Sequence, residues 1–329
     1  MVVYHAIVAV DVLINSPPAW LLAVNDACSP FRMPVMMFLS GLLLPRSLDK
    51  PRRIYLAGKL RGIAWPYVVW TAMMLGFFAA GAARERRLLT AERVWVILTS
   101  PSTFTWYLAY LFAYYLLALV VPPILRVAAI PVLIIASGFI DEEWLVRFVF
   151  LLGMFFAGEW VARHPGFWAG VRNRPTILVA ATVALLVMAS SGSGESGRYS
   201  AVSSLGVAGL IIAGMPISRR IRDTTAGRLL RSIGHDSLVY YVTHWIPIAI
   251  CVQIMATVSE FHPTLAVVVA TGVGLGVSAT ALKLRACSRM VARLYAWPER
   301  KPLIHPSGEL TDGSGAGDVK DSDGYPLRP

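Results

Sequence analysis

Two histidines stand inside apolar stretches of this sequence, where an imidazole could act as a general base. His5 lies near the start of the first stretch, and Asp11 follows six residues later. Imidazole titrates near neutral pH, but a histidine that only bonds a neighbouring helix would be structural, and the residues alone leave both interpretations open. A six-residue offset is a poor same-face spacing on a helix, so Asp11 is not well placed to orient His5.

The second histidine ends a row of hydroxyl-bearing residues late in the chain. The row has offsets of 0, 3, 4 and 7 and comprises Ser237, Tyr240, Tyr241 and His244. Such offsets place side chains on one face of a helix. Polar side chains inside a bilayer are costly unless they face protein or water. This face could therefore line a cavity for a sugar or a phosphate, or it could hydrogen-bond to another helix.

Two further groups of aromatic and basic residues lie near the beginnings of apolar stretches. Trp106, Tyr107 and Tyr110 could anchor a helix at the membrane interface or stack against a sugar ring. Lys59 and Arg61 could contact the phosphates of a nucleotide-type donor. They could equally belong to the ordinary basic charge of a cytoplasmic loop.

The composition indicates that these residues belong to an integral membrane protein. The chain has 329 residues, of which 56% are hydrophobic and 15% are charged, whereas soluble domains carry about 25% charged residues. The apolar residues form blocks long enough to cross a hydrocarbon core about 30 Å thick. The net charge of +11 lies mostly in short loops between these blocks, as is typical of membrane proteins, so we expect no nucleic-acid partner.

The cysteines do not form a metal-binding pattern. Cys28, Cys251 and Cys287 contain no CxxC pair and do not cluster with histidines along the sequence. We therefore expect neither a zinc site nor a disulfide framework, and we expect no bound cofactor.

Hydropathy predicts an all-α fold, a polytopic transmembrane helix bundle of about ten helices. The predicted spans, of which the second and fifth are short, cover residues 1–24, 33–45, 62–82, 104–121, 124–140, 144–162, 175–190, 200–218, 235–256 and 262–283. Basic residues gather in the loops that follow the second, sixth, eighth and tenth spans, which all fall on one side if ten spans alternate. The exception is a loop that holds Arg84, Arg86, Arg87 and Arg93. This asymmetry predicts that both termini are cytoplasmic.

The two ends of the chain differ in character from the spans. Met1 leads directly into an apolar run with no basic flank, so we expect the native start to lie upstream. Residues 296–329 are rich in Pro, Gly, Ser and Asp. This composition predicts a disordered cytoplasmic tail after a transmembrane domain of residues 1–295.

Four motifs, in this order along the chain, resemble the acyltransferase-3 family of polytopic membrane enzymes. Residues 31–41, with the sequence FRMPVMMFLSG, resemble the family's entry to its second helix. A basic run that ends with Lys59 and Arg61 leads into the Trp-Pro-Tyr of residues 65–67. Residues 105–111 resemble a W-[FY]-L helix, and residues 232–244 resemble a G-x-x-S-x-x-x-Y-x-x-H signature.

The resemblance implies an O-acyltransferase that moves an acyl group, usually acetyl, from acyl-CoA to a carbohydrate hydroxyl. It implies that His5 is the catalytic base. Members of the family typically carry an arginine eleven positions before this histidine, a position that would precede Met1. They often carry basic residues three apart in the loop, whereas Lys59 and Arg61 are two apart.

The resemblance also assigns the partners of the remaining candidate residues. The acyl donor would be bound by Lys59, Arg61 and Arg32. The acceptor, a carbohydrate or lipid-linked sugar, would be bound by Trp106, Tyr107, Ser237, Tyr240 and His244. Acyl-CoA would act as a co-substrate, in a multi-pass protein of the plasma (inner) membrane.

Two other functions fit a polytopic chain with polar residues inside its spans. A secondary transporter would also have ten or more helices and polar residues at the bilayer midplane, but its broken helices would occur at matched positions of two repeats. An inactive accessory subunit of a polysaccharide export or modification system would need no catalytic base.

Overall fold

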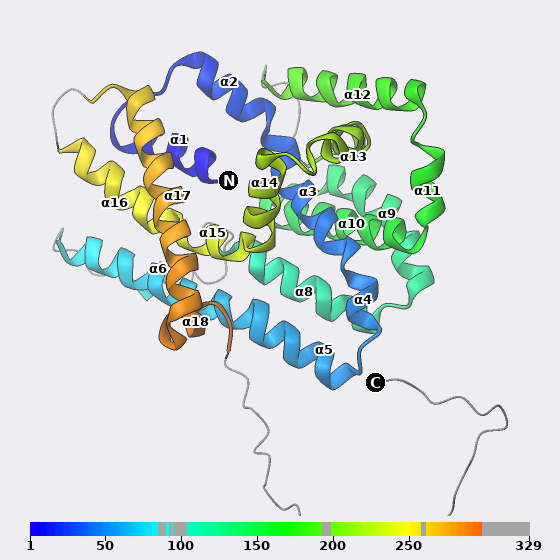
Figure 1. Cartoon of the computed structure of the whole chain (residues 1–329), viewed down its shortest axis with the longest axis horizontal. Helices are drawn as coiled ribbons and strands as arrows, with labels where there is room; N and C mark the ends of the chain where they lie inside the picture. Colours follow the sequence, from blue (N-terminus) through cyan, green and yellow to red (C-terminus); the bar gives the residue numbers. More distant parts are fainter. Residues whose placement is uncertain (85–89, 92–93, 95–103, 193–198, 258–260, 298–329) are drawn as a thin grey trace, which may run out of the picture. The chain divides into compact units, whose positions relative to one another are not determined.

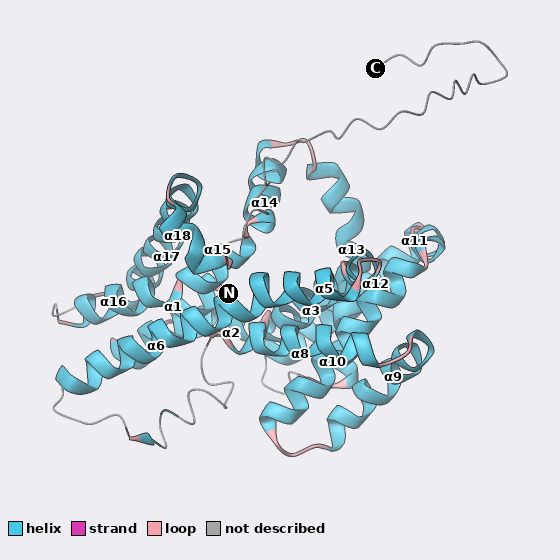
Figure 2. Ribbon diagram, turned by 90° about the horizontal axis from the view of Figure 1, so that it is seen from below, coloured by secondary structure: helices cyan, strands magenta, loops and turns pink. Residues whose placement is uncertain are grey.

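A computed structural model of the chain describes residues 1–84, 90, 91, 94, 104–192, 199–257 and 261–297. The described residues are helices joined by short connections, and they include no β-strand (Figure 1, Figure 2). The predicted all-α fold is therefore confirmed. Arg86, Arg87, Arg93 and residues 298–329 of the predicted tail lie outside the described residues.

Among the described residues, six helical segments are long and apolar enough to cross a membrane. They are residues 52–84 (α5, Arg52–Lys59; a π-helical turn, Leu60–Ala64; and α6, Trp65–Arg84), α10 (Glu143–Arg163), α12 (Arg174–Gly192), α13 (Ala201–Ile221), residues 237–256 (α15, Ser237–Thr243, and α16, Trp245–Ala256) and α17 (Pro263–Cys287). Shorter apolar helices are α1 (Val2–Leu13), α8 (Trp106–Val120) and α9 (Pro123–Ala136), which a 3-10 turn extends to Phe139. Together they form the helices of a multi-pass membrane protein.

The first predicted span, residues 1–24, is wrong as a single helix. The chain forms α1 and then α2 (Ala19–Ala27), with Pro17 and Pro18 between them. Pro18 precedes α2 in an extended conformation, with φ −54° and ψ 142°. Proline has no N–H to donate and it disfavours a helical residue before it, so the pair ends α1 after only twelve residues.

The centre of the bundle is the contact between α3 (Ser29–Leu42) and α10. Gly41 of α3 and Gly158 of α10 lie against each other, and a Cβ atom on Gly158 would overlap the carbonyl oxygen of Phe38. The two backbones therefore approach as closely as small residues allow in membrane helix pairs. α3 corresponds to the short second span, predicted at residues 33–45.

In the part of the chain that the structure describes, the buried apolar side chains form two clusters. The larger includes Met37 of α3, Tyr114 of α8 and Phe155 of α10. The smaller joins α1, α16 and α17 through residues such as Val10, Val252 and Ala270. The remaining helices, which lie outside these spans, are α4 (Leu44–Leu48), α11 (Pro165–Gly170), α14 (Thr225–His235) and α18 (Arg289–Tyr295).

Candidate active site

His5 and His244 lie side by side although 239 positions separate them in the sequence. Their ring centroids are 5.1 Å apart, with the ring planes inclined by 41°. His5 belongs to α1, which packs against α16 and α17 (Figure 1). His244 also contacts the ring of Phe104, a member of the larger apolar cluster, with centroids 5.9 Å apart. The histidine pair therefore lies where the two clusters meet.

A break in the ninth predicted span positions His244. α15 ends at Thr243 and α16 begins at Trp245. Pro247 has no N–H to donate to the carbonyl of Thr243, so the helical hydrogen-bond ladder is interrupted beside His244. The ring nitrogen Nδ1 of His244 lies 2.8 Å from the carbonyl oxygen of Tyr240. A carbonyl only accepts, so Nδ1 carries the proton and Nε2 keeps its lone pair.

The Nε2 atoms of both histidines are buried, and neither has a hydrogen-bond partner among the described residues. A buried polar atom without a partner costs about 1–3 kcal/mol. Such atoms are rare in folded proteins, and each calls for a functional or structural explanation. The Nε2 lone pair of His244 can accept a proton from a bound molecule, which is the chemistry of a general base, and the neighbouring Nε2 of His5 can hydrogen-bond to the same molecule.

Aromatic side chains close the space around His244. Phe104 stacks on Trp245 with ring centroids 5.8 Å apart and planes 16° from parallel. Tyr241 donates its hydroxyl hydrogen to the carbonyl of Phe104. Its ring lies 5.3 Å from the ring of Tyr107. These rings give the histidine pair a dry, low-dielectric wall.

The predicted acceptor-binding residues lie in two regions, at the beginning of α8 and along α15 to the helix break that follows it. His244 lies beside His5, as described, whereas Tyr107 is buried and its hydroxyl shares a hydrogen bond of 2.9 Å with Ser40 Oγ. The Trp106 ring contacts Tyr110, at a centroid distance of 5.1 Å. α15 begins at Ser237 and includes Tyr240, whose backbone carbonyl faces His244.

The predicted donor-binding residues divide into two groups. The Arg32 guanidinium lies 4.3 Å from the ring centroid of Tyr4, the residue before His5, and donates to Asn25 Oδ1 at 2.6 Å. Lys59 instead donates to Ser47 Oγ at 3.1 Å and lies 3.4 Å from the ring centroid of Tyr115 on α8.

Arg61 belongs to the π-helical turn Leu60–Ala64, and its carbonyl accepts from the backbone N–H of Trp297. π-Turns within helices are frequent at functional sites. The structure thus brings Arg32 to the α1 helix of His5, and it places Lys59 and Arg61 along the α5–α6 segment.

Sequence reasoning missed the contribution of α18 to this site. The hydroxyls of Tyr295 and Thr243 are 2.9 Å apart, and both residues are buried. Burial raises the pKa of Tyr295 above its ordinary value, so the phenol stays protonated and able to donate. Trp65 and Trp70 of α6 donate their indole N–H groups to backbone carbonyls of α18. α18 is thereby fastened to α6 and to the helix break beside His244.

A buried ion pair was also missed. Both carboxylate oxygens of Glu159 on α10 accept hydrogen bonds of 2.7 Å from Arg126 on α9. Arg163 adds a third at 2.9 Å. Arg126 also donates to two backbone carbonyls at the end of α8. A single basic residue in one predicted span and a single acidic residue in the next were the signals that could have found this pair.

Comparison with known proteins yields one family. The family model described as an acyltransferase domain matches residues 1–283, a range that includes His5, His244 and every predicted site residue. α18 lies beyond the matched range. No curated protein and no solved structure matches the chain. The resemblance drawn from the four motifs is therefore confirmed.

Proposed function

Since the chain belongs to this acyltransferase family, we propose that it transfers an acetyl or other acyl group from acyl-CoA to a hydroxyl of a cell-envelope carbohydrate or glycolipid. The family makes the chain a membrane acyltransferase in general. The donor, the acceptor and the roles of individual residues are the content of the proposal.

The observation that carries the proposal is the pair of unpaired Nε2 atoms on His5 and His244. In the proposed reaction His5 removes the proton of the acceptor hydroxyl while its oxygen attacks the thioester carbonyl. A carbon–oxygen ester bond forms, the carbon–sulfur bond breaks, and the coenzyme A thiolate leaves and takes up the proton from His5. His244 assists by accepting a hydrogen bond from the acceptor hydroxyl or from the protonated ring of His5.

Basic residues would bind the donor in this scheme. Arg32 approaches α1 through Tyr4, so its charge can contact the donor near His5. Lys59 and Arg61 would contact the donor's phosphates around the π-helical turn between α5 and α6, because guanidinium and ammonium groups make charge-assisted hydrogen bonds to phosphate. No bound cofactor is required, since acyl-CoA supplies the reacting group as a substrate.

The remaining candidates would recognise the acceptor. Ser237, Tyr240 and Trp106 can supply hydroxyl and aromatic contacts of the kind that bind sugars. The protein would act in the plasma (inner) membrane with both termini in the cytoplasm, where acyl-CoA is available. A comparison of envelope glycans from a deletion strain and its parent by mass spectrometry would identify the acceptor through the loss of an acyl-sized mass.

The test of the mechanism is acyl transfer by a His5→Ala variant. Loss of a general base lowers turnover by about 10²- to 10⁴-fold, measured as the release of free coenzyme A in the presence of envelope glycans. The matched control is His262→Ala, which removes an exposed histidine at the beginning of α17 and should leave turnover unchanged. Undiminished turnover of His5→Ala would remove this residue from the proposed role.

A further inference from the structure

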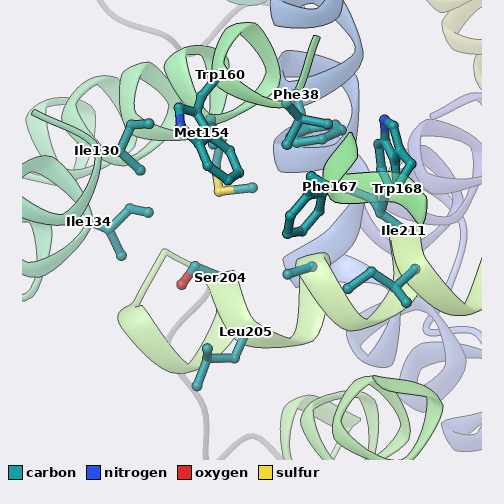
Figure 3. A pocket seen from close by; sticks show the side chains of 14 residues that line it. Phe38, Ile130, Ile134, Met154, Trp160, Phe167, Trp168, Ser204, Leu205 and Ile211 are labelled. Carbon is teal, nitrogen blue, oxygen red and sulfur yellow. The ribbon is translucent and has the colours of Figure 1, made fainter. Parts of the chain in front are cut away.

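An apolar pocket lies between α9 and α13, away from the residues assigned to catalysis (Figure 3). It has a volume of about 280 Å³. Ile130 and Ile134 of α9 line one side of the space in Figure 3, and Phe167 and Trp168 of α11 line the opposite side. We call it the α9–α13 pocket.

The α9–α13 pocket has an apolar lining that suits a hydrocarbon chain. Ser204 supplies a hydroxyl, and that hydroxyl donates to the carbonyl of Ala201 in its own helix at 2.6 Å. Apolar cavities of this kind do not retain water, because a water molecule needs several polar partners. Leu205, which lines the pocket, is 62% exposed, so the pocket opens toward the outside of the bundle. In a membrane helix this surface faces lipid.

Basic charge gathers beside the α11 end of the pocket. The stretch from Trp160 to Arg174 contains Arg163, Arg172 and Arg174 and no acidic residue. Arg163 is paired with Glu159. Arg172 and Arg174 are exposed, and neither makes an ion pair or a side-chain hydrogen bond with another described residue. Two arginines therefore remain available to an anion at this end.

The neighbouring aromatic residues place this end at the membrane surface. Trp160, Phe167 and Trp168 all line the α11 side of the pocket, and tryptophan is enriched at the level of lipid headgroups. Basic pockets between membrane helices bind the phosphate headgroups of anionic lipids. The α9–α13 pocket thus has an apolar lining, opens toward lipid, and lies near two exposed arginines that have no ion-pair partner among the described residues.

We propose that the α9–α13 pocket is a binding site for one anionic phospholipid. One acyl chain lies in the pocket between α9 and α13, and the phosphate lies at Arg172 and Arg174. This inference does not depend on acyl transfer, so it can fail or succeed separately from the proposed function.

The test measures lipid retention by the purified full-length chain with native mass spectrometry. Dioleoyl phosphatidylglycerol is compared with dioleoyl phosphatidylcholine, which has the same chains and no net charge. Wild type is expected to retain one phosphatidylglycerol in preference to phosphatidylcholine. Arg172→Gln and Arg174→Gln should each reduce this preference about fivefold. Arg219→Gln, at the exposed end of α13, is the control and should not change it.

A second variant tests the pocket itself. Ala208→Trp fills the pocket from α13 and should weaken retention on the order of tenfold. Ala189→Trp, on an exposed position of α12, is the matched control and should retain the lipid. Equal retention of the two lipids by wild type, or equal losses in both tryptophan variants, would overturn the proposal in favour of unspecific surface lipid. A lipid-free dimer of the wild type would overturn it in favour of a second copy.

A fluorescence measurement keeps the test informative if Ala208→Trp does not fold. Phosphatidylglycerol with brominated chains should quench the part of the tryptophan emission that the Trp168→Phe variant lacks. Quenching that is the same in wild type and Trp168→Phe would show that no chain enters the pocket and would overturn the proposal.

Discussion

Two buried polar clusters in this molecule differ in how completely their atoms are paired. In the Arg126–Glu159 cluster both carboxylate oxygens accept, and the guanidinium donates to Glu159 and to two backbone carbonyls. In the His5–His244 pair each ring keeps a buried nitrogen with no partner among the described residues. Removing one partner from a fully paired buried cluster is costly, whereas a buried polar atom without a partner is itself a cost to the folded state. This difference separates residues that hold helices together from residues to which the proposed function assigns a substrate.

The largest effect is expected from breaking the paired cluster. Glu159→Ala leaves the Arg126 guanidinium, which is 4% exposed, without its carboxylate. Removing one partner of a buried ion pair costs about 3–5 kcal/mol, so the thermal unfolding midpoint in detergent should fall steeply. Glu143→Ala removes an 82% exposed carboxylate that pairs with Arg147, and as the control it should cost less than about 1 kcal/mol. Equal falls in the unfolding midpoint for Glu159→Ala and Glu143→Ala would show that the buried ion pair contributes no more to stability than the exposed one.

For the unpaired cluster we expect a loss of activity without a loss of stability. His244→Phe preserves a ring of similar shape and removes the unpaired Nε2 atom. Turnover should fall by about 10²-fold or more, while the unfolding midpoint changes little, because the lost bond from Nδ1 to the Tyr240 carbonyl offsets the gain from no longer burying an unsatisfied nitrogen. The measurement is coenzyme A release alongside thermal unfolding of the same sample. If the variant has a lower unfolding midpoint but full specific activity, His244 is a structural residue and the assignment is wrong.

A smaller effect is expected beside the unpaired cluster, where α18 contacts the helix break at His244. Tyr295→Phe removes the hydroxyl that bonds Thr243 beside the break at His244. The loss of one hydrogen bond costs about 1 kcal/mol, and turnover should fall several-fold with little change in KM for acyl-CoA. Tyr114→Phe is the control, because it removes a hydroxyl that bonds the carbonyl of Phe148 on α10, and it should leave turnover unchanged. An unchanged kcat in Tyr295→Phe would limit α18 to a packing role.

The smallest effect is expected for the third member of the paired cluster. Arg163 is 39% exposed and donates to a carboxylate that Arg126 already pairs. Arg163→Gln should therefore cost less than about 1 kcal/mol in the free energy of unfolding. A loss as large as that of Glu159→Ala would mean that the ion pair depends on all three residues.

Hydropathy was sufficient to predict the helical fold because the apolar blocks are local features of the sequence. It did not predict the break between α1 and α2, since an average over 24 residues hides the effect of Pro17 and Pro18 on the backbone. It also treated residues 235–256 as continuous and missed the interruption that Pro247 makes at His244.

The site was predicted unevenly for the same reason. His5 and His244 could be singled out because each is costly in an apolar stretch, and the structure places them together. Tyr295 could not, because its partner Thr243 is 52 positions away and neither residue is unusual in its own surroundings. Arg126 and Glu159 could have been paired from the sequence, because one predicted span contains a single basic residue and the next contains a single acidic residue. Hydropathy alone does not use this signal.

The most direct test of the account is a double-variant cycle on the two histidines. Turnover is measured for His5→Ala, His244→Ala and the chain that carries both changes, with thermal unfolding as the check on folding. If the two unpaired nitrogens serve one reaction, the double variant should be about as slow as the slower single variant, since residues that act as a unit are strongly non-additive. Losses that multiply, or wild-type turnover in either single variant, would contradict a shared catalytic pair.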